Sequence, residues 1–114
     1  MKTNFDDQLK ISADGRRLEA CGELEWDDPT SNEIVVTVTI TQGAVVATKR
    51  SNPFVRPAAE WMVDLRPGPG QKFQEGPAQA TGVLRVTVSF PAGASAEPDF
   101  SWAGNPNLAF DVSD

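Results

Sequence analysis

Alternation of apolar and polar residues is the dominant pattern along this chain, and turn residues separate the alternating runs. A period of two residues is typical of β-strands that bury one face and expose the other. The most regular runs cover residues 17–26, 33–41 and 78–90. Their inward side chains are expected to be Leu18, Ala20, Gly22, Leu24, Trp26, Ile34, Val36, Val38, Ile40, Ala78, Ala80, Gly82, Leu84, Val86, Val88 and Phe90. The sequence therefore predicts an all-β fold.

Shorter runs at 9–11, 44–51, 100–102 and 108–112 predict the remaining strands. Asp14-Gly15 and Gln42-Gly43 are suited to tight turns, because glycine tolerates positive φ angles. Segment 58–66 fits a strand or a short helix, and we favour the strand. Gly82 predicts a bend or bulge in its long strand. The irregular run 44–51, or the run 108–112, is expected to form a sheet edge and to carry any edge-to-edge contact.

The number and spacing of these runs predict one domain over residues 1–114, an antiparallel two-sheet sandwich of about seven strands. Its pattern resembles that of immunoglobulin-like and fibronectin-like sandwiches. Two hallmarks of antibody domains are absent, since the chain has one cysteine and no tyrosine. The likeness is therefore one of strand pattern alone.

Charge and composition narrow the class of partner. The chain has 16 acidic and 10 basic residues, a net charge of −6. Nucleic acids and anionic membranes are bound by clustered Lys and Arg, so neither is an expected partner. The single Cys21 and an acidic N-terminus without an apolar core favour the cytoplasm. A chain from which a leader had been removed would look the same.

Histidine is absent from the sequence, which removes the commonest general base and metal ligand. Glu19, Glu23 and Glu25 share a strand face that we expect to be solvated, where burial cannot raise a carboxyl pKa. Cys21 lies between these acids and is expected to stay protonated. The oxygen-rich turn at 27–33 could supply calcium ligands, but its spacing matches no calcium loop. We therefore expect no enzyme activity, no cofactor and no bound metal.

A non-catalytic module that acts through protein–protein interaction or assembly is the function this pattern favours, with a protein partner that could be a second copy. The alternative is a small-ligand or carbohydrate-binding module that uses loop aromatics. Two Pro/Gly-rich loops each place a phenylalanine near a cation, a pairing typical of interface anchors. The candidate binding residues are Phe54, Arg56, Lys72 and Phe73. Each phenylalanine could instead be buried as part of the core, as we expect for Trp26, Trp61 and Trp102.

Overall fold

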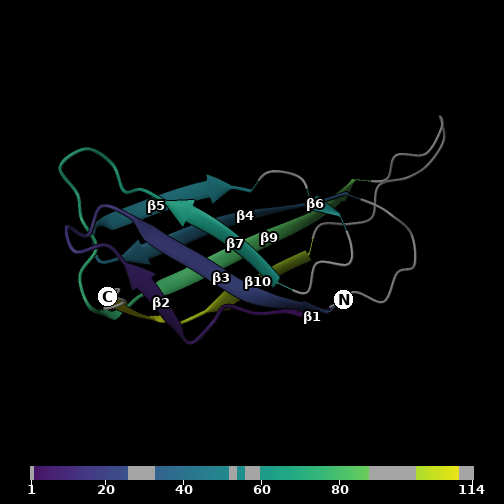
Figure 1. Ribbon diagram of the computed structural model, residues 1–114, viewed down its shortest axis with the longest axis horizontal. Helices are drawn as coiled ribbons and strands as arrows, with labels where there is room; N and C mark the ends of the chain where they lie inside the picture. The colour runs from purple at the N-terminus through teal and green to yellow at the C-terminus, as the bar shows by residue number, and fades with distance from the viewer. Residues whose placement is uncertain (1, 26–32, 52–53, 56–59, 88–99, 111–114) are drawn as a thin grey trace.

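The alternating runs become strands in the computed structural model, which describes residues 2–25, 33–51, 54–55, 60–87 and 100–110 (Figure 1). Three of the strands contain only two residues. In chain order they are β1 (Lys2–Thr3), β2 (Gln8–Ile11), β3 (Leu18–Glu25), β4 (Glu33–Gln42), β5 (Val45–Arg50), β6 (Phe54–Val55), β7 (Glu60–Leu65), β8 (Gly76–Pro77), β9 (Gln79–Thr87), β10 (Phe100–Gly104) and β11 (Asn107–Phe110).

Two sheets form from these strands and face each other as two layers (Figure 1). The six-stranded sheet has the order β1-β3-β2-β11-β8, and β7 pairs with β3. Since β7 is on the opposite side of β3, β1 and β2 are successive neighbours along one edge of β3. The five-stranded sheet has the order β10-β9-β4-β5, and β6 also pairs with β4. The expected all-β, two-sheet architecture is confirmed.

One strand pair departs from the antiparallel arrangement that the sequence predicts. β11 pairs in parallel with β2, with Leu108 opposite Leu9. The chain reaches this position because it leaves β10 at Gly104, turns through Pro106 and enters the other sheet. Strands that switch sheets at a corner are a known feature of β-sandwiches.

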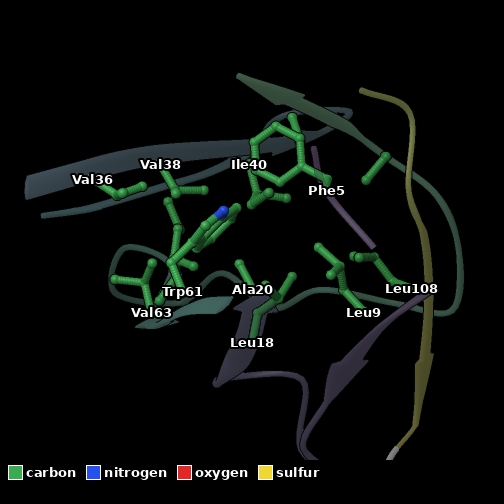
Figure 2. Close-up of a cluster of buried hydrophobic side chains, with 14 of the residues drawn as sticks. Phe5, Leu9, Leu18, Ala20, Val36, Val38, Ile40, Trp61, Val63 and Leu108 are labelled. Carbon is green, nitrogen blue, oxygen red and sulfur yellow. The ribbon is translucent and has the colours of Figure 1, made fainter. Parts of the chain in front are cut away.

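The core lies between the two sheets and draws residues from both (Figure 2). Trp61 of β7 extends between Val36, Val38 and Ile40 of one layer and Ala20 of the other. Its indole Nε1–H donates a hydrogen bond of 3.0 Å to Thr3 Oγ1, so the polar atom of this buried ring is satisfied. The ring of Phe5 packs edge-on against Trp61 with centroids 5.4 Å apart.

The predicted register is confirmed wherever the inward residues are described. The side chains of Leu18, Ala20, Leu24, Val36, Val38, Ile40, Ala78, Ala80 and Leu84 are all buried. Nothing is described of Trp26, Val88 and Phe90, or of the side chains of Ile34 and Val86. Val35, expected to be exposed, does lie on the outer face but is only 5% exposed. Val35 lines a hollow on that face together with the long side chains of Arg50 and Arg85.

Segment 60–65 is a strand, as favoured, and its residues alternate between buried and exposed. The bulge expected at Gly82 is absent, because the β4–β9 register runs without interruption from Glu33–Thr87 to Thr41–Gln79. Glycine is needed there for packing instead. A Cβ at position 82 would lie 2.6 Å from Cη2 of Trp102, which covers the β9 backbone at that point.

The edge prediction is confirmed for β5, which pairs only with β4 among the described strands. The other candidate, 108–112, does not supply an edge in its described part, since β11 has β2 on one side and β8 on the other.

Candidate functional site

The predicted loop residues Lys72 and Phe73 lie between β7 and β8, at the end of the sandwich that holds the β2–β3 turn. Phe73 is only 1% exposed and belongs to the core cluster. Its backbone N–H donates to the carbonyl oxygen of Gly15 at 2.8 Å. Gly15 has a φ of +70°, and a Cβ there would collide with the Phe73 carbonyl. Phe73 is therefore a core anchor for two loops, whereas Lys72 is exposed.

Phe54 lies at the opposite end of the sandwich from Phe73. Its backbone pairs with Ile34 at the start of β4, while the 74–77 loop contacts Gln42 at the end of β4. The ten residues of β4 separate the two ends by about 30 Å. The side chain of Phe54 and the whole of Arg56 lie outside the described residues. The structure therefore does not bring the two predicted loops together.

A hollow of about 400 Å³ opens beside Lys72, between the β2–β3 turn and the chain end at β11. Phe110 lies on its rim and is 38% exposed. Asp14, also in the lining, accepts hydrogen bonds from the Ser12 hydroxyl and the Arg16 backbone N–H, which lower the pKa of its carboxyl. The hollow thus combines an exposed aromatic ring with acidic and basic groups.

The second hollow, of about 520 Å³, lies beside the β4–β5 turn and has no ionisable residue in its lining. Gln42, which lines this hollow, is hydrogen-bonded to the neighbouring 74–77 segment. The side-chain Nε2 donates to the Gln74 carbonyl at 2.8 Å, and the Gln74 N–H donates to Gln42 Oε1 at 2.8 Å. Both ends of this amide are therefore used to hold the 74–77 loop.

The outer face of the five-stranded sheet has an unusual composition. Cross-strand partners point to the same side, so the register defines its members. We name it the threonine face, and it consists of Val35, Thr37, Thr39 and Thr41 of β4, Val46, Thr48 and Arg50 of β5, Gln79, Thr81, Val83 and Arg85 of β9, and Ser101 and Ala103 of β10.

None of the described side chains of the threonine face is acidic, and the charged ones among them are Arg50 and Arg85. The register places Glu33 on the same side of the sheet, next beyond Val35, and its side chain is not described. Val46 and Val83 are exposed by 47% and 37%. A hydroxyl-to-hydroxyl hydrogen bond of 3.0 Å joins Thr39 to Thr48 across the β4–β5 pair. The described side chains of the face are therefore neutral or basic, and some are apolar.

The outer face of the six-stranded sheet is charged instead. Glu19 is opposite both Lys10 and Asp64, and Glu23 is opposite Glu60. Like charges directly opposite each other on a sheet are destabilising. Met62, which is 62% exposed, is opposite Cys21 in the middle of this face. The two outer faces of the sandwich therefore differ in charge and in chemistry.

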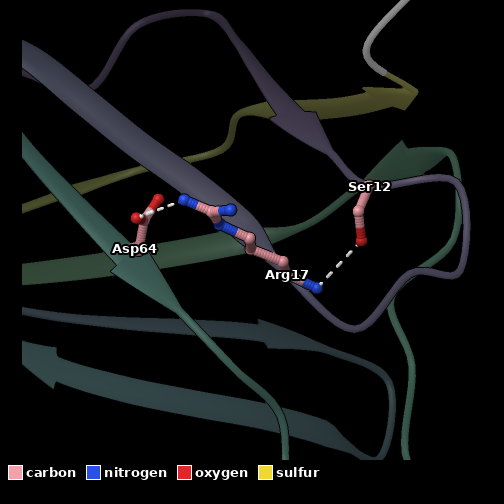
Figure 3. Close-up of polar contacts among 3 residues, drawn as sticks. All are labelled: Ser12, Arg17 and Asp64. Carbon is pink, nitrogen blue, oxygen red and sulfur yellow. Dashed lines mark hydrogen bonds and ion pairs between the residues drawn. The ribbon is translucent and has the colours of Figure 1, made fainter.

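Arg17 links the β2–β3 turn to β7 at one end of this charged face (Figure 3). Its guanidinium Nη2 lies 2.8 Å from Asp64 Oδ2, and its backbone N–H donates to Ser12 Oγ at 3.1 Å. The hydrogen bond from Arg17 to Asp64 and its charge raise the pKa of Arg17. Both side chains of the ion pair are about half exposed, so it positions the β2–β3 turn against β7 more than it stabilises the fold.

Cys21 is half-buried on the same face and is the chain's single thiol. Burial raises its pKa to about 12, helped by the thiol's hydrogen bond to Asp6 Oδ2 at 3.0 Å and by the nearby negative charges. The thiol is therefore protonated at neutral pH, as the sequence predicts, and is a poor nucleophile.

The described residues hold no group of three or more Cys, Asp or Glu side chains arranged to bind a metal ion. The oxygen-rich turn at 27–32 lies outside them. None of the described segments is a helix long and apolar enough to cross a membrane. No protein-family model matches the chain, and neither a curated protein nor a solved structure does.

The alternation within each single strand of the sequence does not reveal the threonine face. The outward positions of Thr37, Thr39 and Thr41 were visible in the alternation of one run. Their assembly with Thr48 and Thr81 depends on which strands are neighbours and in what register. A count of acids on the outward positions of each run would have indicated the contrast between the two faces.

Proposed function

We propose that this chain is a non-catalytic β-sandwich module that acts through protein–protein contacts, and that the threonine face is its contact surface. The observation that carries the proposal is the absence of acids among the described side chains of that face, in a chain with a net charge of −6. Interface centres are depleted in Asp, Glu and Lys and enriched in Arg. Exposed Val46 and Val83 add apolar area that association would remove from water.

We further propose that the sandwich is of the immunoglobulin or fibronectin kind. In those domains the second strand pairs with the fifth, and the third, sixth and seventh share the other sheet. When the two-residue strands are left out of the count, β3 and β7 are the second and fifth strands here, and they pair. The third, sixth and seventh are β4, β9 and β10, which are adjacent in the other sheet with β5 beside β4. Such sandwiches recur in recognition modules, and this fold-level likeness supports a binding role by analogy alone.

A photo-activated cross-linking residue at Val46 tests the contact surface in the cells that make the protein. Position 46 is expected to form an adduct with another protein, and the same residue at Met62, on the opposite face, is not. The double substitution Thr39→Glu/Thr48→Glu, combined with the cross-linker at 46, should abolish the adduct, whereas Glu23→Gln should leave it. Adducts from position 62 alone would overturn the assignment.

The hollow beside Lys72 supports a second candidate function, the binding of a small polar ligand. Its size falls within the range of ligand pockets, and Phe110 offers an exposed ring for stacking. A panel of glycans and metabolites read by thermal shift tests it, because a ligand that binds the folded state raises the melting temperature. The shift should disappear in Phe110→Ala and persist in Val46→Ala. If no compound of the panel raised the melting temperature in this way, the proposal that the hollow binds a small ligand would be wrong.

A further inference from the structure

The exposed edge of β10 differs from the other sheet edges. Among the described strands β10 pairs with β9 alone. Every second residue of an edge strand directs its backbone N–H and C=O away from the sheet, where they can pair with another strand. The side chains of Ser101 and Ala103 in this strand are exposed on the outer face of the sheet.

The other edges carry features that discourage pairing with a further strand. In β5, Lys49 is opposite Val38 and therefore points to the inner side at the rim. In β7, Glu60 and Asp64 are charged, and β8 is a two-residue strand that ends in Pro77. Charges, inward-pointing lysines, short strands and proline are the usual means of blunting an edge.

None of these features is present in β10, whose sequence is Phe-Ser-Trp-Ala-Gly. The strand is also held firmly in place. Trp102 covers Gly82, and its ring centroid lies 5.3 Å from that of Phe5 and 5.8 Å from that of Trp61. Because the edge is already ordered, pairing with it costs little conformational entropy.

We propose that two copies of the chain pair through antiparallel β10 strands about a two-fold axis and join their five-stranded sheets into one. Charge favours a second copy of this strand as the occupant. Self-pairing through β5 would place Lys49 and Arg50 near their own copies, and self-pairing through β7 would do the same for Glu60 and Asp64. Self-pairing through β10 brings together the small neutral residues Ser101 and Ala103.

This inference goes beyond the proposed function, because the contact it describes is made by the backbone edge of β10, although Ser101 and Ala103 of that strand also belong to the threonine face. It also replaces the expectation that an edge contact would use residues 44–51 or 108–112. The isologous arrangement closes after two copies and leaves no free β10 edge for further growth. Joined in this way, the two threonine faces lie side by side on one continuous sheet.

The solution mass of the purified chain tests the proposal, measured by light scattering from micromolar to millimolar concentration. We expect twice the mass of one chain for the native sequence and the mass of one chain for Ser101→Glu/Ala103→Glu. The matched control, Val46→Glu/Thr48→Glu, places the same charges on the other edge of the same sheet and should remain a dimer. Circular dichroism and the melting temperature identify any variant that fails to fold.

Hydrogen exchange of the native chain gives a measurement that needs no variant. The outward amides of β10 should exchange more slowly at high protein concentration than at low concentration, and those of β7 should not change. A native chain that stays monomeric throughout would overturn the proposal, as would a dimer that the β10 variant leaves intact or the β5 variant dissociates. The β5 variant also changes the threonine face. If this variant no longer forms the cross-linked adduct but remains a dimer, the two proposals concern two separate contacts.

Discussion

The indole of Trp102 lies directly over Gly82, so a residue of β10 fills the space that a side chain on β9 would need. The shortest approaches of a Cβ at 82 would be to the Trp102 ring itself, with Cε2 at 2.7 Å. Those ring atoms are part of a rigid aromatic cluster with Phe5 and Trp61, and they cannot move aside as the end of a flexible chain would.

Gly82→Ala is therefore expected to destabilise the fold by about 1 to 3 kcal/mol, the usual cost of overpacking a core. Urea unfolding would measure the change. Gly68→Ala is the matched control, since its Cβ would meet only Gln71, at an ordinary 3.6 Å. Equal stability of the two variants would mean that Trp102 does not occupy this position.

The strand register predicts opposite outcomes for adjacent residues of β9. Leu84 is fully buried, and Leu84→Ala should cost about 2 to 5 kcal/mol through lost contacts and the cavity left behind. Val83 is on the threonine face, and Val83→Thr, which keeps a β-branched side chain, should change the free energy of unfolding by less than about 0.5 kcal/mol. The reverse order of effects would show that the register is shifted by one residue.

Phe73 supplies a test of the loop anchor. Phe73→Ser removes a fully buried ring and leaves a hydroxyl in its place, so we expect a loss of at least about 3 kcal/mol. The adjacent Lys72→Ser should be within about 0.5 kcal/mol of the native chain, because Lys72 is exposed. Thermal and urea melts of both variants would check this. If Phe73→Ser had native stability, Phe73 would not be a core anchor and would again be a candidate for an exposed binding residue.

The reactivity of Cys21 reports on its contact with Asp6. With a pKa of about 12, the folded thiol should react with a disulfide reagent far more slowly near pH 9.0 than the urea-unfolded chain does. Asp6→Asn removes one negative charge and replaces a carboxylate oxygen by an NH2 group that can donate to the thiolate, so it should speed the reaction, while burial still keeps the pKa above its ordinary value. Asp7→Asn is the control. No acceleration in Asp6→Asn would show that burial alone limits access.

The same pKa has a consequence for stability. The folded thiol holds its proton more tightly than the unfolded thiol, whose ordinary pKa is 9.0. Its contribution to the free energy of unfolding is therefore complete below pH 9.0 and declines as pH rises from there to about 12. Cys21→Ser should lack this component of the alkaline destabilisation in urea melts across that range.

Sequence reading predicted the strands well because burial on one face imposes a period of two on β3, β4, β7 and β9. It gave the wrong reason for Gly82, since the partner that requires a glycine there is Trp102, on another strand. It also missed the parallel pairing of β11, because local alternation contains no information about which strand becomes the neighbour.

The candidate site was harder to predict for the same physical reason. Phe73 stands outside any alternating run, so its burial depends on the distant turn at Gly15, to which its N–H donates. The threonine face exists only once β4, β5, β9 and β10 are laid side by side. Surfaces made by register are properties of the whole sheet and not of any one segment.

The parallel pairing of β2 with β11 also governs the order in which the chain can fold. Gln8 is opposite Asn107, so β2 can form this pair only with β11, a strand far away in the sequence. On a ribosome, β2 would emerge before β11 and remain without that neighbour until β11 had been made. Contacts so distant in sequence slow folding, because the chain loses entropy on closure before the contact stabilises it. The β4–β5 hairpin is the local contact of the five-stranded sheet and can form first, whereas the pairing of β4 with β9 also joins distant segments. The docking of β11 would then be the final step that closes the sandwich.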